Sequence, residues 1–143
     1  MLGSCDVSAT PEALSCTVAL TALITSPYNL VKDASVYAKV LALNFYGEGP
    51  ISTAGNGALV ILVPDTPIHF QNNPSLTNED QISMTWEDGL SDGGSPVQSY
   101  KIQYDQSIGS YTTLVDGLTT KYFTTAGSLI KGRTYKFKIQ ARN

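Results

Sequence analysis

Few residues of this chain have side chains suited to catalysis or metal binding. The sequence has one histidine, His69, and two cysteines, Cys5 and Cys16. Structural zinc takes four cysteine or histidine ligands, and a lone histidine far along the chain from both cysteines does not supply them. No G-x-S-x-G or comparable motif places a nucleophile beside a base. The sequence therefore predicts a protein that is not an enzyme, with no catalytic residue, no cofactor and no metal ion.

An acidic loop is the remaining place for a cation. Glu87, Asp88 and Asp92 precede Gly93 and Gly94. Carboxylates bind calcium, but these do not have the spacing of an EF-hand loop. We interpret the segment as a polar loop with turn residues, and His69 as a surface or strand-edge histidine.

The two cysteines lie close together near the start of the sequence. An even count and short spacing favour a disulfide between Cys5 and Cys16 in an oxidising compartment. Such a bond would contribute about 3 kcal/mol through the chain entropy of the unfolded state. The alternative interpretation is a pair of unrelated buried thiols.

Composition narrows the classes of partner. The chain has 143 residues, 42% of them hydrophobic and only 15% charged, with a net charge of -3. This balance supports a packed core and provides no basic stripe for nucleic acid. No apolar run approaches the roughly 20 residues needed to span a bilayer, so we expect no membrane insertion. The first residues lack the pattern of a signal peptide. Low charge with many hydroxyl side chains is typical of secreted or matrix proteins and leaves room for glycans on Ser and Thr.

Apolar and polar residues alternate along most of the chain, which predicts β strands. In the first half, the alternation predicts strands around Cys16–Leu20, over Val36–Asn44 and over Ala58–Val63. Only Pro11–Leu14 has room for one helical turn. Residues 64–67, with two prolines, are expected to be a linker.

The second half has the clearer pattern. Strands are expected around Ile82–Trp86, Tyr100–Tyr104, Tyr111–Val115, Lys121–Thr125 and Tyr135–Ala141, with a turn at Asp116-Gly117. Strands at this spacing are typical of a β-sandwich or barrel. Side chains of one parity should form the core: Trp86, Tyr100, Ile102, Leu129, Tyr135, Phe137 and Ile139.

The chain also contains an internal repeat. Leu30 aligns with Leu129, 99 positions later, and at the same offset Lys32 aligns with Lys131, Val40 with Ile139, Ala42 with Ala141 and Asn44 with Asn143. Similarity at a fixed offset indicates duplicated units. An offset near the length of one sandwich domain indicates tandem domains.

These motifs resemble fibronectin type III domains. "ISMTW" resembles the strand that carries the family's core tryptophan, here Trp86. "DGGSPVQSYKIQY" is similar to the loop and strand that follow it. "LIKGRTYKFKIQARN" is similar to the penultimate strand, with Leu129 and Tyr135 as the tyrosine-corner pair; in the first half, Val36 stands in place of that tyrosine. A narrower similarity is to repeats of very large surface or extracellular proteins of single-celled eukaryotes.

The resemblance implies an all-β, immunoglobulin-like sandwich organisation with incomplete domains. Residues 1–63 are expected to be the last strands of one domain plus a Cys-containing segment, and residues 68–143 a domain that lacks its final strand. An unpaired strand edge recruits another strand. We therefore expect neighbouring repeats, of the same or an identical chain, to join head to tail. The expected strand-addition segment is Leu59, Val60, Ile61, Leu62 and Val63.

Three functions fit these expectations. The first is a non-catalytic structural or adhesive repeat of an extracellular or cell-surface array, with filament formation by strand complementation. The second is a ligand-binding module of a receptor ectodomain. The third is an accessory domain of a secreted hydrolase. A fold does not by itself identify a ligand, and the sequence contains no Arg-Gly-Asp motif for integrin-style adhesion.

Overall fold

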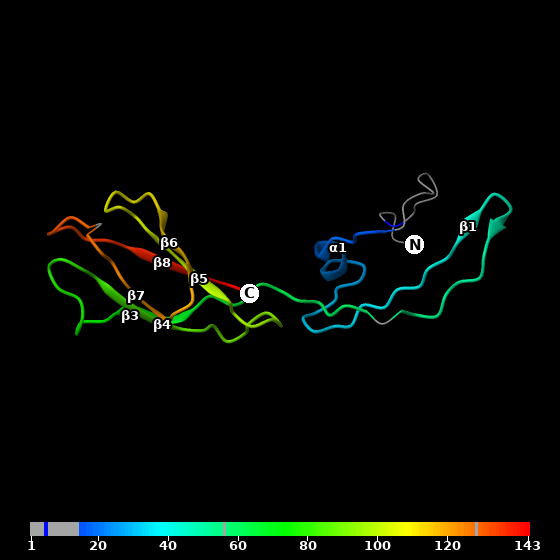
Figure 1. The fold of residues 1–143 in the computed structure, drawn as a ribbon, viewed down its shortest axis with the longest axis horizontal. Coiled ribbons are helices and arrows are strands. Elements are labelled where there is room, and N and C mark those ends of the chain that lie inside the picture. The colour runs from blue at the N-terminus through cyan, green and yellow to red at the C-terminus, as the bar shows by residue number, and fades with distance from the viewer. Residues whose placement is uncertain (1–4, 6–14, 56, 128) are drawn as a thin grey trace. The chain divides into compact units, whose positions relative to one another are not determined.

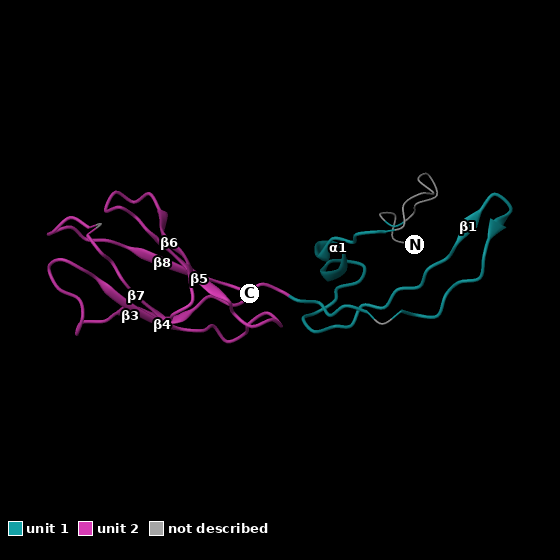
Figure 2. Ribbon diagram, viewed as in Figure 1, with its two compact units in different colours: residues 1–61 teal, residues 62–143 magenta. Residues whose placement is uncertain are grey.

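The computed structural model describes Cys5 and residues 15–55, 57–127 and 129–143. It divides into two compact units, Met1–Ile61 and Leu62–Asn143, shown in Figure 2. The division falls close to the start of the Pro-rich segment 64–67.

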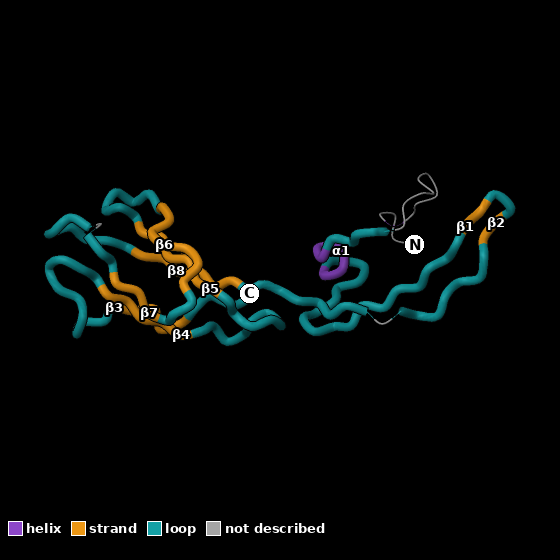
Figure 3. The backbone as a smooth tube through the Cα atoms, viewed as in Figure 1, coloured by secondary structure: helices purple, strands orange, loops and turns teal. Residues whose placement is uncertain are grey.

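Unit 2 consists of two antiparallel three-stranded sheets, as expected for a β-sandwich (Figure 1 and Figure 3). Apolar residues alternate along most of these strands, so each sheet has one face that must be buried. The first sheet has the order β3-β4-β7, and the second β6-β5-β8. The strands are β3 (Ile68–Asn72), β4 (Ser83–Glu87), β5 (Ser99–Tyr104), β6 (Thr112–Leu118), β7 (Tyr122–Thr124) and β8 (Phe137–Arg142).

The core lies between the two sheets around Trp86 and Ile102. Trp86 of β4 is 3% exposed, and Tyr100 and Ile102 of β5 are 4% and 0% exposed. The Trp86 ring meets the Tyr100 ring edge to face, with the centroids 5.4 Å apart. Aromatic pairs in this geometry add stability beyond the apolar area that they bury. The Phe70 ring of β3 also meets the Trp86 ring edge to face, with the centroids 6.1 Å apart.

Four of the expected core residues are less buried than their alternation predicts. Leu129, Tyr135, Phe137 and Ile139 are each half-buried. The last two belong to β8, which is the outer strand of its sheet. Parity selects the face of a strand, but the depth of burial depends on what lies beside the strand.

The expected turn at Asp116-Gly117 is wrong. Both residues lie within β6, where the register against β5 is irregular. Gly117 has a positive φ of 80°, and the glycine allows a kink inside β6. The chain reverses direction only after Leu118, where β6 ends.

Unit 1 contains a short helix, α1 (Leu20–Ile24), and a long β-hairpin whose tip is formed by β1 (Leu43–Asn44) and β2 (Gly47–Glu48). The strand expected around Cys16–Leu20 is therefore wrong, because the chain turns helical at Leu20. The Thr25 hydroxyl donates a hydrogen bond to the Thr21 carbonyl, and Pro27 lies two residues further along, which helps to end the helix after one turn. The expected turn at Pro11–Leu14 lies outside the described residues.

The expected strand over Val36–Asn44 forms only in part. Its backbone bonds run the length of the hairpin, but continuous pairing is limited to β1 and β2, with isolated bridges at Ser35↔Leu59 and Ala38↔Gly55. The register shifts between these contacts. A two-stranded hairpin that packs against no sheet has no buried face to fix its register.

Candidate functional site

The open edge of β8 is the feature of unit 2 best suited to binding another chain. β8 pairs with β5 from Ser99↔Arg142 to Tyr104↔Phe137, and no strand among the described residues pairs with its other side. The Asp105 N–H donates to the Lys136 carbonyl at 3.1 Å, so Lys136 turns its backbone groups toward β5. Antiparallel pairing alternates, and the backbone groups of Phe137, Ile139 and Ala141 therefore face the open side.

Two hollows lie along this edge. One, of about 430 Å³, is mainly apolar and is lined by Phe70, Ile82, Met84, Tyr135 and Phe137. It lies between β3 and β4 of one sheet and the start of β8 in the other. Such a hollow exposes the flank of the core, and an apolar side chain that filled it would gain burial.

The second hollow lies at the other end of β8. It measures about 370 Å³ and is lined by residues 63–66 and by Gln140 to Asn143. Each hollow is therefore lined on one side by β8 or its flanking residues. On the other side, the first is lined by β3 and β4, and the second by residues 63–66, which precede β3. An extended strand laid along β8 would cross both.

Tyr135 anchors the beginning of β8. Its hydroxyl accepts a hydrogen bond from the Ile130 N–H at 2.8 Å. Its ring lies beside that of Tyr104 of β5, with the centroids 6.2 Å apart. Tyr135 therefore acts as the corner residue that its position in the sequence suggests, and it aligns β8 as the strand begins.

Asp105 is a positioning residue that was not predicted from the sequence. It is 5% exposed, and its Oδ1 accepts hydrogen bonds from the N–H groups of Ser107 and Lys136, both at 3.0 Å. The Lys136 backbone N–H, assisted by the Ser107 N–H, holds the pKa of Asp105 below its usual value. The available signal was an aspartate directly after a strand and before Gln-Ser-Ile-Gly, a composition typical of an Asx turn.

Asn143 is a second residue whose structural role was not predicted from the sequence. Its amide nitrogen donates to the Leu62 carbonyl at 2.9 Å and to the Asp92 carbonyl at 2.8 Å. The Leu62 N–H in turn donates to the Gly93 carbonyl at 2.8 Å. Asn143 thus ties the end of β8 to the entering chain and to the acidic loop. The signal in the sequence was its alignment with Asn44.

Side chains of the acidic loop have hydrogen-bond and ion-pair partners within the protein. Asp88 accepts a hydrogen bond from the Tyr100 hydroxyl and pairs with the Lys121 ammonium at 2.6 Å. The bond from Lys121, and then that from Tyr100, lowers the pKa of Asp88, while burial and the bond to Asp88 raise the pKa of Tyr100 to about 12. Both shifts move away from neutral pH, which is the opposite of what a general acid or base needs.

The remaining candidates also serve local structure. Asp92 accepts the Gly94 N–H at 2.8 Å, within the turn. His69 lies on the edge strand β3, 3.2 Å from a Glu87 carboxylate oxygen, and both side chains are exposed. Within the described residues, no group of three His, Cys, Asp or Glu side chains is placed to hold a metal ion.

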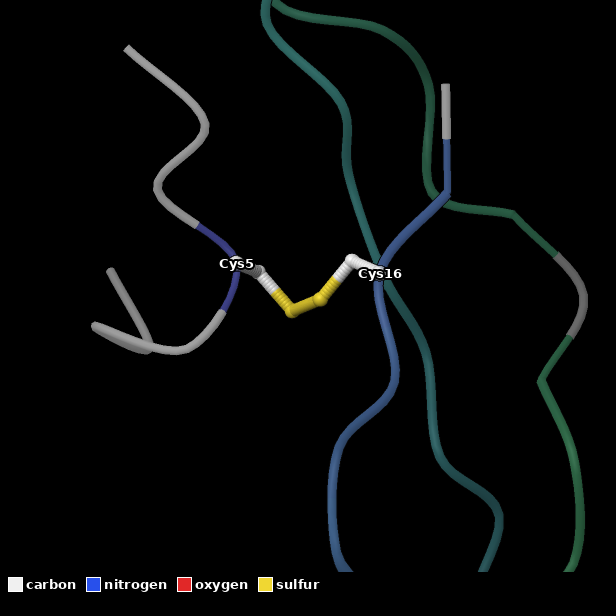
Figure 4. Close-up of a disulfide and its surroundings, with 2 residues drawn as sticks. All are labelled: Cys5 and Cys16. Atoms are coloured by element: carbon white, nitrogen blue, oxygen red, sulfur yellow. A yellow bond between two sulfur atoms is a disulfide. The ribbon is translucent and has the colours of Figure 1, made fainter. Parts of the chain in front are cut away.

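A disulfide joins Cys5 and Cys16 in unit 1, with their Cα atoms 5.3 Å apart (Figure 4). This separation lies in the usual range for the bond. The bond ties the start of the chain to the segment that leads into α1.

The expected strand-addition segment divides between the two units. Val60 is 1% exposed within unit 1, whereas Leu59, Ile61 and Val63 are exposed and Leu62 is half-buried. Val60 also exchanges backbone bonds with Ala34 and Asp33, so part of the segment is already paired.

Comparison with known proteins identifies unit 2. The family model described as Fibronectin type III domain matches residues 71–143. This match covers half of the chain and nearly all of the sandwich. The chain belongs to the fibronectin type III family.

Relatives of this fibronectin type III chain are much longer proteins. It is 32% identical over 88 residues to the titin homolog of Caenorhabditis elegans, covering 60% of this chain and a share of the relative that rounds to 0%. It is 30% identical over 103 residues to the Fibronectin type-III domain-containing protein 3a of Gallus gallus, covering 68% of this chain and 8% of that protein. The chain therefore spans less than a tenth of the length of these relatives.

A solved structure supports the fold of this fibronectin type III chain. Domains A168–A170 of titin superpose with a TM-score of 0.58 at 21% identity, covering 80% of this chain and 37% of that one. At this identity the likeness concerns the fold alone. The narrower similarity to surface proteins of single-celled eukaryotes stays a prediction.

Proposed function

We propose that this chain is a non-catalytic structural or adhesive repeat of an extracellular or cell-surface tandem array, and that neighbouring repeats join at the open edge of β8. The observation that carries the proposal is that, among the strands of the described residues, β8 is paired on one side only, beside an apolar hollow of about 430 Å³. A strand edge of this kind favours strand addition.

The internal repeat supports a tandem organisation. Residues 30–44 carry the pattern of residues 129–143, and in unit 1 they form a hairpin with the chain that follows them. On this basis, residues 1–63 are the closing part of one domain and residues 68–143 the larger part of the next. The relatives with matching segments are much longer proteins, which is consistent with this chain being one part of a longer array.

Two features support an oxidising, extracellular setting. The Cys5–Cys16 disulfide is a bond that persists outside the reducing cytosol. The sequence is also low in charge and rich in Ser and Thr, which are acceptors for O-linked glycans. Within the described part of the chain, no helix is long and apolar enough to cross a membrane.

Strand addition also gives the array its direction. A strand from one repeat and an edge from the next form a head-to-tail contact, and a contact of this type extends into an open filament unless rotation closes it. The edge of β8 would be used in the same way whether the repeats belong to one continuous polypeptide or to separate subunits.

Amide hydrogen exchange on the native material tests this function. The amides of Phe137, Ile139 and Ala141 should be protected, because a neighbouring strand accepts their hydrogen bonds. Their rapid exchange in an otherwise folded assembly would show that no strand is added. Denaturing electrophoresis of the same material then separates the two arrangements, with a band near 15.3 kDa for docked subunits and a very large band for a continuous chain.

A further inference from the structure

The sequence contains three Asp-Gly pairs, at residues 88–89, 92–93 and 116–117. In such a pair the backbone nitrogen of the glycine can attack the aspartyl carboxyl group, because glycine has no side chain to obstruct the approach. The product is isoaspartate, in which the main chain runs through the former side chain. The three pairs are the same dipeptide, so the fold must account for a difference among them in the native protein.

Contacts restrain the first pair, Asp88-Gly89, on both sides of the reacting bond. The Asp88 carboxylate accepts hydrogen bonds from the Lys121 ammonium and the Tyr100 hydroxyl, and these two bonds lower its pKa. A carboxyl oxygen leaves as water only when it is protonated, so a carboxylate that is kept ionised reacts slowly. A Cβ at Gly89 would lie 2.6 Å from the Cβ of Asp65, which shows how closely this backbone is packed.

The second pair, Asp92-Gly93, is restrained at the attacking nitrogen itself. The Gly93 N–H donates to the Ser91 hydroxyl at 3.2 Å, and the Gly93 carbonyl accepts a hydrogen bond from the Leu62 N–H at 2.8 Å. Gly93 is buried, and the Asp92 carboxylate already accepts the Gly94 N–H at 2.8 Å. Reaction at this pair therefore requires a local opening that breaks these contacts.

The third pair, Asp116-Gly117, lies in a bulge of β6. Two residues of β6, Asp116 and Gly117, stand opposite a single residue of β5, Lys101. A bulge leaves its extra residue outside the regular ladder of hydrogen bonds. Both residues are exposed, and a Cβ at Gly117 would meet no atom within 4 Å. This backbone has the room to move that the other two pairs lack.

The Asp116 carboxylate is held by a single long contact. The Arg142 Nη2 lies 3.3 Å from the Asp116 Oδ2, and both side chains are exposed, so the ion pair contributes little stability. Among the described residues, this carboxylate has no other hydrogen-bond or ion-pair partner. The Asp88 side chain is just as exposed, 42% against 43% for Asp116, so contacts and not exposure distinguish the two.

We propose that Asp116 is a site of spontaneous isomerisation to isoaspartate, selected by the fold from the three Asp-Gly pairs. The Gly117 nitrogen forms a bond to the side-chain carbonyl carbon of Asp116, and a carbon–oxygen bond of the carboxyl group breaks. The oxygen leaves as water with the carboxyl proton and the Gly117 amide proton, and a succinimide ring remains. Water then opens the ring. Cleavage at the side-chain carbon restores aspartate, and cleavage at the main-chain carbonyl carbon gives isoaspartate of unchanged mass.

Isomerisation would act on the sheet as well as on the residue. Isoaspartate adds one methylene to the backbone of β6, so the pairing with β5 on the two sides of the bulge must shift. The carboxylate also moves to a new place on the chain and leaves Arg142 without its present partner. This inference goes beyond the proposed function and does not depend on how repeats join.

Ageing of the full-length native chain at neutral pH and physiological temperature tests the proposal. Trypsin places Asp116 in the peptide 102–121, apart from the other two pairs. Chromatography separates the two forms of equal mass, and fragmentation locates the altered residue. Isoaspartate should accumulate at least about tenfold faster at Asp116 than at Asp88 or Asp92, since those two react only after local opening. Similar rates at all three, or a faster rate at either of the other two, would overturn the proposal.

The same ageing in urea shows whether the fold makes the selection. Unfolding removes the contacts of all three pairs, so their rates should become similar. If Asp116 stays far ahead in urea, its sequence neighbours select it and selection by the fold is wrong.

Asp116→Glu is the matched variant. It keeps the carboxylate, but the longer side chain would have to close a larger ring, so the altered form of peptide 102–121 should disappear. If that form persists in the variant, it arises at Asp105, the other aspartate of this peptide, and the proposal is wrong.

Discussion

The Tyr135 hydroxyl accepts a hydrogen bond from the Ile130 N–H at 2.8 Å, five residues back along the chain. This contact closes the turn before β8 and fixes where the edge strand begins. In the repeat of unit 1, Val36 occupies the equivalent position and has no hydroxyl. The two repeated segments thus share a sequence pattern, but only the second has this hydrogen bond from a tyrosine hydroxyl.

Tyr135→Phe should therefore lower stability. The substitution keeps the ring but leaves the Ile130 N–H without this acceptor, at a cost of about 1 kcal/mol. Thermal unfolding should show a Tm lower by about 4–8 °C for a domain of this size. Tyr122→Phe, at an exposed position, is the control and should leave Tm nearly unchanged; equal shifts in the two variants would mean that the corner contact is not the cause.

Ile102→Ala should be the more damaging change. Ile102 is fully buried between the sheets, and truncation of a buried isoleucine costs about 2–5 kcal/mol. Denaturant unfolding can be followed through Trp86, which is the single tryptophan of the chain and lies in the same core. The folded protein should emit at short wavelength. Ile130→Ala, at an exposed site, should cost less than about 0.5 kcal/mol; a red-shifted maximum for the native protein would contradict this core.

Alkaline pH should weaken unit 2 through Tyr100. Burial raises its pKa to about 12, above the value of 10.0 for a free tyrosine. Because the folded-state pKa is the higher one, the stabilisation is complete below pH 10 and is lost as the pH rises toward 12. Unfolding free energy measured from pH 8 to 12 should fall over that interval, and Tyr100→Phe should remove this part of the decline. If the free energy of unfolding falls equally in Tyr100→Phe, the decline is caused by other titratable groups.

Gly93→Ala and Gly109→Ala should differ although both glycines have positive φ, 78° and 88°. A Cβ at Gly93 would overlap the Leu62 carbonyl, whereas a Cβ at Gly109 meets open space. Gly109→Ala should cost about 1–2 kcal/mol, the strain of a left-handed residue. Gly93→Ala should cost more, because the contact between the acidic loop and the entering chain must also shift. Equal losses in denaturant unfolding would show that this close approach is absent in solution.

Reduction should act on unit 1 and leave unit 2 folded. The intact mass without reduction should be about 2 Da lower than with reduction, because Cys5 and Cys16 are joined. Trp86 emission, which reports on unit 2, should not change on reduction. Alkylation of either cysteine in the native, unreduced protein would contradict the bond.

Alternation and motif were sufficient to predict the sandwich and most of its strands. Alternation placed Trp86 in the core, and the resemblance of "LIKGRTYKFKIQARN" to fibronectin type III domains placed Tyr135 at the corner before β8. These features are local, since strand parity and the corner tyrosine depend on residues a few positions apart. The short helix at Leu20 was missed because Cys16, Val18 and Leu20 alternate by chance, and a single helical turn has too few residues to show a period.

Tertiary structure decided what the sequence could not. The alternation along 135–141 is the same whether β8 is central or outermost in its sheet. Only the folded structure shows that β8 is an outer strand among the described residues and that Phe137 and Ile139 are half-buried. Asp105 and Asn143 carry no motif of their own, and their roles arise from backbone groups of Lys136, Leu62 and Asp92 that folding brings to them. The sequence determines which face of each strand is apolar, because parity is a local property. Which strand stands at the edge, and which polar side chain finds a distant carbonyl, depends on pairings between residues far apart in the chain.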